Sequence, residues 1–110
     1  MVDVGGGVYV SRTDTQEWEP DDEVGGSAHM LFDLGATKAG LWRAEGDERG
    51  DPVDVEIPAR ETIVVLEGAV RVGVDGEPHD LREGDMLSIP AGTMVGWDPS
   101  PGCKVFWVYS

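Results

Sequence analysis

Short runs of apolar residues, often alternating with polar ones, occupy most of the chain. Alternation with a period of two predicts half-buried β-strands. No stretch of ten or more residues shows the periodicity of an amphipathic helix. Glycine and proline turn signals separate the runs at intervals of about 8–12 residues, which is typical of an all-β sandwich or small barrel. The predicted strands are residues 8–11, 27–33, 37–44, 53–57, 62–66, 69–74, 77–81, 86–89, 93–97 and 104–109.

Two local features refine this pattern. Asp75-Gly76 stands between the runs 69–74 and 77–81, and an Asp-Gly pair at such a place is a strong signal for a tight β-hairpin. The acidic segment 16–26, "QEWEPDDEVGG", carries no alternation and is expected to be a loop. Both features are consistent with an all-β chain.

Size and composition set further limits. With 110 residues the chain is expected to form one domain. No apolar run approaches the roughly 20 residues of a membrane helix, and the N-terminal residues lack the pattern of a secretory signal. Cys103 is the single cysteine, which excludes an internal disulfide and suits a reducing compartment. We therefore expect a cytoplasmic protein.

The charge narrows the range of partners. Twenty-two acidic residues stand against eight basic ones, for a formal net charge of −14. Such a surface repels the phosphates of nucleic acids and the headgroups of anionic membranes. We expect neither as a partner, and the charge itself bears on solubility rather than on chemistry.

Residues 37–110 resemble the cupin family. The similarity is carried by "GLWRAEGD", "ETIVVLEGAV", "DGEPHDLREGDMLSIPAG" and the tryptophan of "GTMVGW". It is greatest with the small single-domain cupins related to ethanolamine-utilisation and ureidoglycine-aminohydrolase cupins. The resemblance implies a double-stranded β-helix, a jelly-roll-like barrel, with residues 37–110 as its core. Residues 1–36 would add N-terminal strands and the acidic loop, completing the barrel or a dimer edge. Similar small cupins commonly form homodimers.

The resemblance also defines where a metal would be held. Cupins that bind a metal usually use two histidines and a glutamate in the first motif and a third histidine in the second. Here Glu61 matches the glutamate, but Val55 and Ile57 stand at the first two histidine positions and Val95 at the third. We therefore expect neither a histidine-ligated metal nor another cofactor.

A second register leaves a carboxylate-rich metal site as an alternative. In that register the histidine positions fall on Asp54 and Glu56, which together with Glu61 would suit a hard cation such as manganese. Strand alternation argues against it, because Val53, Val55 and Ile57 would face the core and both carboxylates would then face water.

The two histidines have their own interpretations. His29 lies in an alternating run, where it shares a face with Leu31 and Asp33. We interpret it as a hydrogen-bonded or solvent-facing strand residue, with a pocket-lining acid/base as the alternative. His79 follows the hairpin turn and is expected at the surface. Two histidines at these positions cannot form a three-histidine site.

Glu61 is the most informative polar residue. If it points into the barrel, it loses hydration and its pKa rises, which makes it a candidate general acid/base or ligand anchor. The structural alternative is an ion pair with Arg60, Arg43 or another cation that only closes the barrel. We expect an apolar pocket around it, and the candidate ligand-binding residues are Trp42, Val55, Ile57, Ile63, Met94, Val95, Trp97 and Trp107.

Together these features favour a metal-independent cupin that binds a small, largely apolar organic molecule in its barrel. Glu61 is the candidate catalytic residue, and the sequence leaves open whether the protein is an enzyme. One alternative is a metal-dependent enzyme of small-molecule metabolism with a carboxylate-rich site. Another is a non-catalytic interaction module whose pocket is filled by its own side chains. The fold alone does not decide among them.

Overall fold

A computed structural model describes residues 2–3, 5–46 and 54–110 of the chain, and Val53 of the expected strand 53–57 lies outside them. The described residues form strands and turns without a helix, so the all-β prediction is confirmed. The strands are β1 (Val2–Asp3), β2 (Tyr9–Val10), β3 (Glu19–Pro20), β4 (Ser27–Asp33), β5 (Lys38–Arg43), β6 (Val55–Glu56), β7 (Glu61–Glu67), β8 (Ala69–Val74), β9 (Glu77–Arg82), β10 (Met86–Ile89), β11 (Met94–Pro99) and β12 (Lys104–Tyr109).

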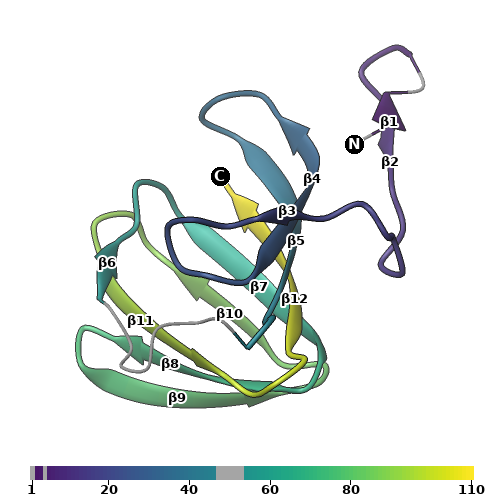
Figure 1. The fold of residues 1–110 in the computed structure, drawn as a ribbon. Helices are drawn as coiled ribbons and strands as arrows, with labels where there is room; N and C mark the ends of the chain where they lie inside the picture. The colour runs from purple at the N-terminus through teal and green to yellow at the C-terminus, as the bar shows by residue number, and fades with distance from the viewer. Residues whose placement is uncertain (1, 4, 47–53) are drawn as a thin grey trace.

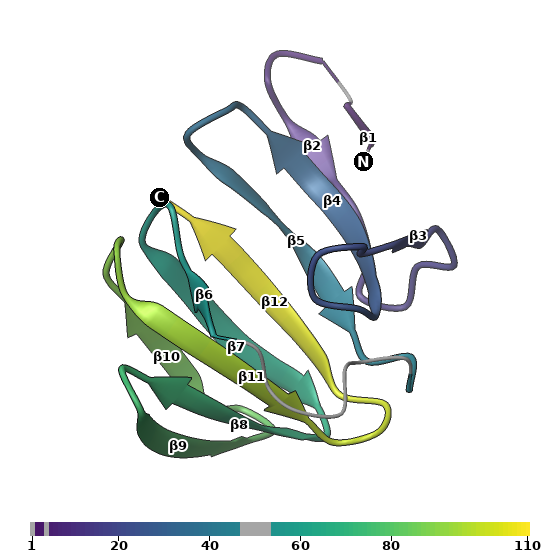
Figure 2. The ribbon, with the colours of Figure 1, turned by 60° about the vertical axis from the view of Figure 1, so that its left-hand side comes forward.

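Two antiparallel sheets face each other and form the barrel (Figures 1 and 2). The six-stranded sheet has the order β10-β7-β12-β5-β4-β3, and the four-stranded sheet has the order β6-β11-β8-β9. Strands distant in sequence lie side by side, since β7 is flanked by β10 and by the C-terminal β12. This arrangement confirms the predicted jelly-roll-like, double-stranded β-helix.

The core lies between the two sheets and follows from strand alternation. In β7 the buried residues are Glu61, Ile63 and Val65, while the residues between them are partly exposed. Val72 and Ile89 come from other strands and are almost completely buried. Each such aliphatic side chain contributes about 1.5–3 kcal/mol through its removal from water. The same alternation that buries Ile63 and Val65 turns Glu61 inward.

The predicted hairpin is confirmed at Asp75-Gly76. The two residues have φ angles of 49° and 85°, and they connect β8 to β9 with Val74 paired to Glu77. Positive φ at both central residues defines the type I′ turn that Asp-Gly favours. The Asp75 carboxylate also accepts a hydrogen bond from the N–H of Met94 at 3.2 Å, which links the hairpin to β11.

The N-terminal region differs from the prediction in detail. The expected strand 8–11 is reduced to Tyr9–Val10 and pairs with β1, which the pattern did not predict. This small hairpin is a separate two-stranded sheet that lies beside β4, where the rings of Tyr9 and Phe32 stack with their centres 6.0 Å apart (Figure 2). The segment 16–26 is a loop apart from the two-residue strand β3, which pairs with β4. Two residues are too few to produce an alternating pattern, so neither β1 nor β3 leaves a signal in the sequence.

A cluster formed by Ser11, Glu17, Trp18 and His29, hereafter the N-terminal latch, fastens this region to β4. His29 is 6% exposed, and its Nδ1 donates a hydrogen bond to the backbone oxygen of Glu17 at 2.7 Å. In the neutral ring Nε2 then accepts from the Ser11 hydroxyl. Trp18 stacks under the guanidinium of Arg43, which lies 4.1 Å from the ring centre. The interpretation of His29 as a hydrogen-bonded strand residue is confirmed.

Candidate ligand-binding cavity

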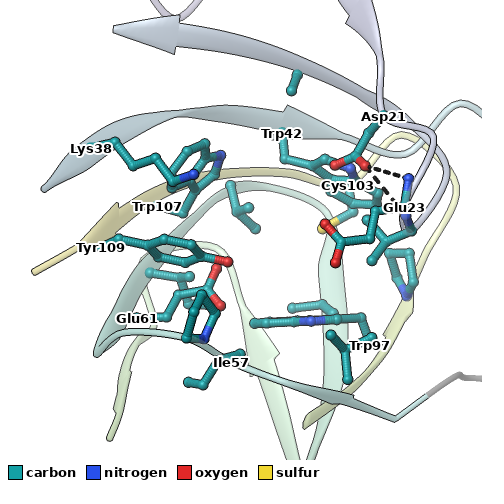
Figure 3. A pocket seen from close by; sticks show the side chains of 18 of the residues that line it. Asp21, Glu23, Lys38, Trp42, Ile57, Glu61, Trp97, Cys103, Trp107 and Tyr109 are labelled. Carbon is teal, nitrogen blue, oxygen red and sulfur yellow. Dashed lines mark hydrogen bonds between the residues drawn. The ribbon is translucent and has the colours of Figure 1, made fainter. Parts of the chain in front are cut away.

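A cavity of about 370 Å³ opens between the two sheets (Figure 3). Strands of both sheets line it, together with the loop that precedes β4. Its walls combine the indoles of several tryptophans with aliphatic side chains and a few charged groups. Seven of the residues expected at the site line this cavity: Trp42, Val55, Ile57, Glu61, Ile63, Trp97 and Trp107.

Glu61 is the buried acid of this cavity. Its neighbours across the sheet are Ile89 on β10 and Tyr109 on β12, and its side chain is only 8% exposed. Burial removes water from the carboxylate and raises the pKa of Glu61 from 4.5 to about 7. Near neutral pH the group is therefore present in both protonation states, as a general acid/base requires.

Glu61 pairs with neither Arg60 nor Arg43, the two arginines named as its possible partners. The Arg60 guanidinium donates to the Ser88 hydroxyl at 2.9 Å, and Arg43 pairs with Glu45. Within residues 2–3, 5–46 and 54–110, no side chain forms a hydrogen bond or ion pair with the Glu61 carboxyl. The carboxyl thus keeps its hydrogen-bonding capacity for whatever occupies the cavity.

Tyr109 adds a second polar group beside Glu61 (Figure 3). Burial, followed by the negative charges of Glu61, Glu23 and Asp21, raises the pKa of Tyr109 to about 12. The hydroxyl therefore stays protonated near neutral pH and can donate a hydrogen bond. The ammonium of Lys38 lies 5.4 Å from the centre of the Tyr109 ring, so a cation already contacts an aromatic face at this site.

Two of the expected ligand-binding residues lie elsewhere. Met94 is exposed and Val95 is completely buried in the core, and neither lines the cavity. Met94 occupies an outward position at the start of β11, because strand alternation sends it opposite to Val95. Val95 shares the inward face with Trp97, which does line the cavity, but belongs to the packed core cluster.

Other cavity residues were not among the sequence candidates. Tyr109 stands two positions after Trp107 on the same strand, so the period of two could have found it. Lys38 pairs with Tyr109 in the register of β5 and β12, which only the assembled sheet reveals. Asp21 and Glu23 come from the acidic loop and carry no sequence signal for this position. The remaining lining residues are Val24, Ala28, Met30, Pro58, Val70, Pro99, Cys103 and Val105, together with Glu56, which was a candidate only for the carboxylate-rich metal site.

The first-motif positions do not fit a histidine-ligated metal. Val55 is half-buried and Ile57 is buried, and like Val95 they carry no metal-binding atom. Asp54 and Glu56 are exposed, as strand alternation predicts. In the part of the chain that the structure describes, no group of three or more His, Cys, Asp and Glu side chains is arranged to hold a metal ion.

Two facing antiparallel sheets in jelly-roll order, with a cavity between them, define the class of jelly-roll barrels to which cupins belong. The particular family follows from its sequence: the EutQ-like cupin domain matches residues 33–104, and the chain belongs to that family. No curated protein matches the chain. No helix among the described residues is long and apolar enough to cross a membrane.

Solved structures share this fold at low sequence identity. An RmlC-like cupin from Shewanella frigidimarina is 23% identical, with a TM-score of 0.73 over 91% of this chain and 87% of that one. KdgF from a Halomonas species is 19% identical, with a TM-score of 0.69 over 96% and 94%. A putative ethanolamine utilization protein Q from Salmonella typhimurium is 21% identical, with a TM-score of 0.64 over 84% and 76%. These similarities establish the fold alone.

Proposed function

We propose that this cupin binds a small, largely apolar organic molecule in the cavity without a histidine-ligated metal, and that Glu61 anchors or activates it. The observation that carries the proposal is a buried carboxyl that has no hydrogen-bond or ion-pair partner among the described residues and faces a cavity lined by three tryptophans. A volume of about 370 Å³ lies in the usual range for small-molecule sites, and indole rings offer flat apolar contact to a ring or acyl chain.

The chemistry available is proton transfer. Glu61 has a pKa of about 7, so it can give or take a proton near neutral pH at little cost. The neutral hydroxyl of Tyr109 lies beside it and can orient a polar group of the ligand. No further cofactor is required for this role. The open cavity also favours ligand binding over an interaction module whose barrel is filled by its own side chains.

Related proposals concern assembly and location. We propose a homodimer, because Val8, Val10 and Leu34 expose apolar surface close to the N-terminal hairpin. Residues 1–36 would then complete the dimer edge, while residues 37–110 form the cupin core. Sedimentation at micromolar concentration tests this, and a monomer there contradicts it. We also propose a cytoplasmic location, with nucleic acids and membranes excluded as partners by the net charge of −14.

The test of ligand binding compares wild-type protein with a cavity-filled variant, Ala28→Trp. Ala28 lines the cavity from β4, so a larger side chain there should occupy ligand space. In a screen of small organic compounds by ligand-observed NMR, wild-type protein should bind compounds that the filled variant does not. Equal binding by both proteins would place the site outside the cavity.

Two measurements address the role of Glu61 and of metal. Glu61→Gln should abolish any turnover of a bound compound while the fold is kept, and Glu77→Gln, at an exposed position outside the cavity, is the matched control. Elemental analysis of protein purified without chelators or affinity metal should find no stoichiometric metal. One tightly bound ion per chain would overturn the metal-independent proposal in favour of the carboxylate-rich alternative.

A further inference from the structure

The charged groups that line the cavity are unbalanced. Among the described residues, three acids of the lining, Asp21, Glu23 and Glu61, stand against one ammonium group, from Lys38, while the side chain of Glu56 shares the outward face with Met94. A single cation offsets only one of the three acids. The cavity is therefore negative even when one of its acids is protonated.

The acids approach the cavity from different elements. The Asp21 carboxylate accepts hydrogen bonds from the N–H groups of Glu23 and Val24, at 3.0 and 3.3 Å, and so fixes the turn of the loop. That turn places the Glu23 carboxyl at the cavity, on a different side from Glu61 (Figure 3). Two carboxyl groups thus face one space, and Lys38, the one cation among the described lining residues, lies against the Tyr109 ring.

The negative charge lies inside the cavity at the buried Glu61 and at its rim at the exposed Glu23. Tyr109 is half-buried, and the charges of Glu61, Glu23 and Asp21 all raise its pKa, after the larger effect of burial. A carboxylate 8% exposed, without a cationic partner among the described residues, is unfavourable because burial removes the water that would stabilise it. A positively charged ligand would remove this penalty.

The aromatic side chains that line the cavity also favour a cationic ligand. Trp42, Trp97, Trp107 and Tyr109 line the cavity, and the face of an aromatic ring attracts cations. The Lys38 ammonium already lies 5.4 Å from the centre of the Tyr109 ring. Carboxylates combined with aromatic faces form an environment suited to an organic cation with an apolar body.

Building on the proposed function, we propose that the ligand carries a protonated amine or a quaternary ammonium group on a small apolar body. Glu61 and Glu23 hold the charge, and the tryptophans contact the body. Binding then favours the ionised form of Glu61. Because this carboxyl titrates at about 7 in the free protein, binding near neutral pH releases a proton and affinity rises as pH increases through that value.

The test uses three probes of nearly equal shape: benzylammonium, benzyl alcohol and benzoate. Their binding is followed by tryptophan fluorescence and by NMR of the indole resonances, since three tryptophans line the cavity. We expect benzylammonium to bind about tenfold more tightly than benzyl alcohol, and benzoate to bind most weakly. The affinity of benzylammonium should rise with pH, whereas that of the alcohol should not.

Two variants test whether Glu61 causes the preference for the amine. Glu61→Gln should lower the affinity for benzylammonium about tenfold and leave that for benzyl alcohol almost unchanged. Glu77→Gln removes the same charge outside the cavity and should change neither affinity. Equal losses in both variants would mean that net charge, and not the site, attracts the amine.

The outcomes separate the two proposals. If the alcohol or benzoate binds as tightly as the amine, the charge class is wrong while the ligand-binding function stands. If none of the three changes the indole signals, both proposals fail. The comparison among ligands on wild-type protein does not depend on whether any variant folds.

Discussion

His29 and Glu61 are both buried ionisable side chains of the six-stranded sheet, 6% and 8% exposed, yet their surroundings differ. Both ring nitrogens of His29 have partners, from Ser11 and Glu17. The Glu61 carboxyl has none among the described residues and faces a cavity. Burial by itself therefore does not distinguish the two residues: His29 is hydrogen-bonded within the protein, whereas the Glu61 carboxyl is directed at the cavity.

The difference arises from which face of the sheet each residue occupies. Ala28 and Met30 line the cavity from β4, so His29 between them points to the outer face. There the other residues of the N-terminal latch cover it. Glu61 points to the inner face. The sheet thus separates a polar residue used for folding from one available to a ligand.

The largest expected effect is a pH-dependent change in stability at Glu61. Its pKa is raised from 4.5 to about 7 in the folded protein, so the folded state binds this proton more tightly than the unfolded state. The resulting stability is complete below pH 4.5 and is lost as pH rises through about 7, by on the order of 3 kcal/mol.

Glu61→Gln removes this dependence. The difference in stability between the variant and wild type should therefore change with pH. Once the pH exceeds the folded pKa of Glu61, it should shift by about 3 kcal/mol in favour of the variant, compared with the difference at low pH. Urea denaturation at several pH values measures the difference, with Glu77→Gln as control. A difference that stays constant with pH would show that Glu61 titrates normally and would remove the contrast with His29.

The next effect is the loss of the latch histidine. His29→Ala should lower the free energy of unfolding by about 2–3 kcal/mol, because two hydrogen bonds and a buried ring are lost. His79→Ala on β9 is the matched control; the His79 side chain is only partly buried, so its loss should cost about 1 kcal/mol or less. Similar values for both variants in urea denaturation would contradict a structural role for the latch.

The smallest effect concerns the hydroxyl of the latch. Ser11→Ala leaves Nε2 of His29 without its partner and should cost about 1 kcal/mol. Ser88→Ala removes an exposed hydroxyl and should cost less than about 0.5 kcal/mol. Neither substitution should alter ligand binding, since Ser11 and Ser88 do not line the cavity. A change in affinity in Ser11→Ala would connect the latch to the site.

Much of the site could be predicted from local pattern. The period of two turns Ile57, Glu61 and Ile63 inward and Asp54 and Glu56 outward, and it does not require knowledge of the partner strands. The prediction that Val95 lines the cavity was wrong. The alternation correctly turns Val95 inward, but how deeply it is buried in the core depends on the residues packed around it. Depth is a property of the assembled sheets and has no period in the sequence.

By itself the sequence determined the all-β architecture, the hairpin at Asp75-Gly76 and the missing metal-binding histidines, and it left the direction of Glu61 open between the barrel interior and an ion pair. These features depend on backbone alternation, turn geometry and residue identity, all of which act over a few positions. Only the tertiary structure decided which charges share the cavity with Glu61. Asp21 and Glu23 come from a loop far from Glu61 in sequence, and Lys38 reaches the cavity through the pairing of β5 with β12. Contacts between distant segments form only when the sheets close around a common core.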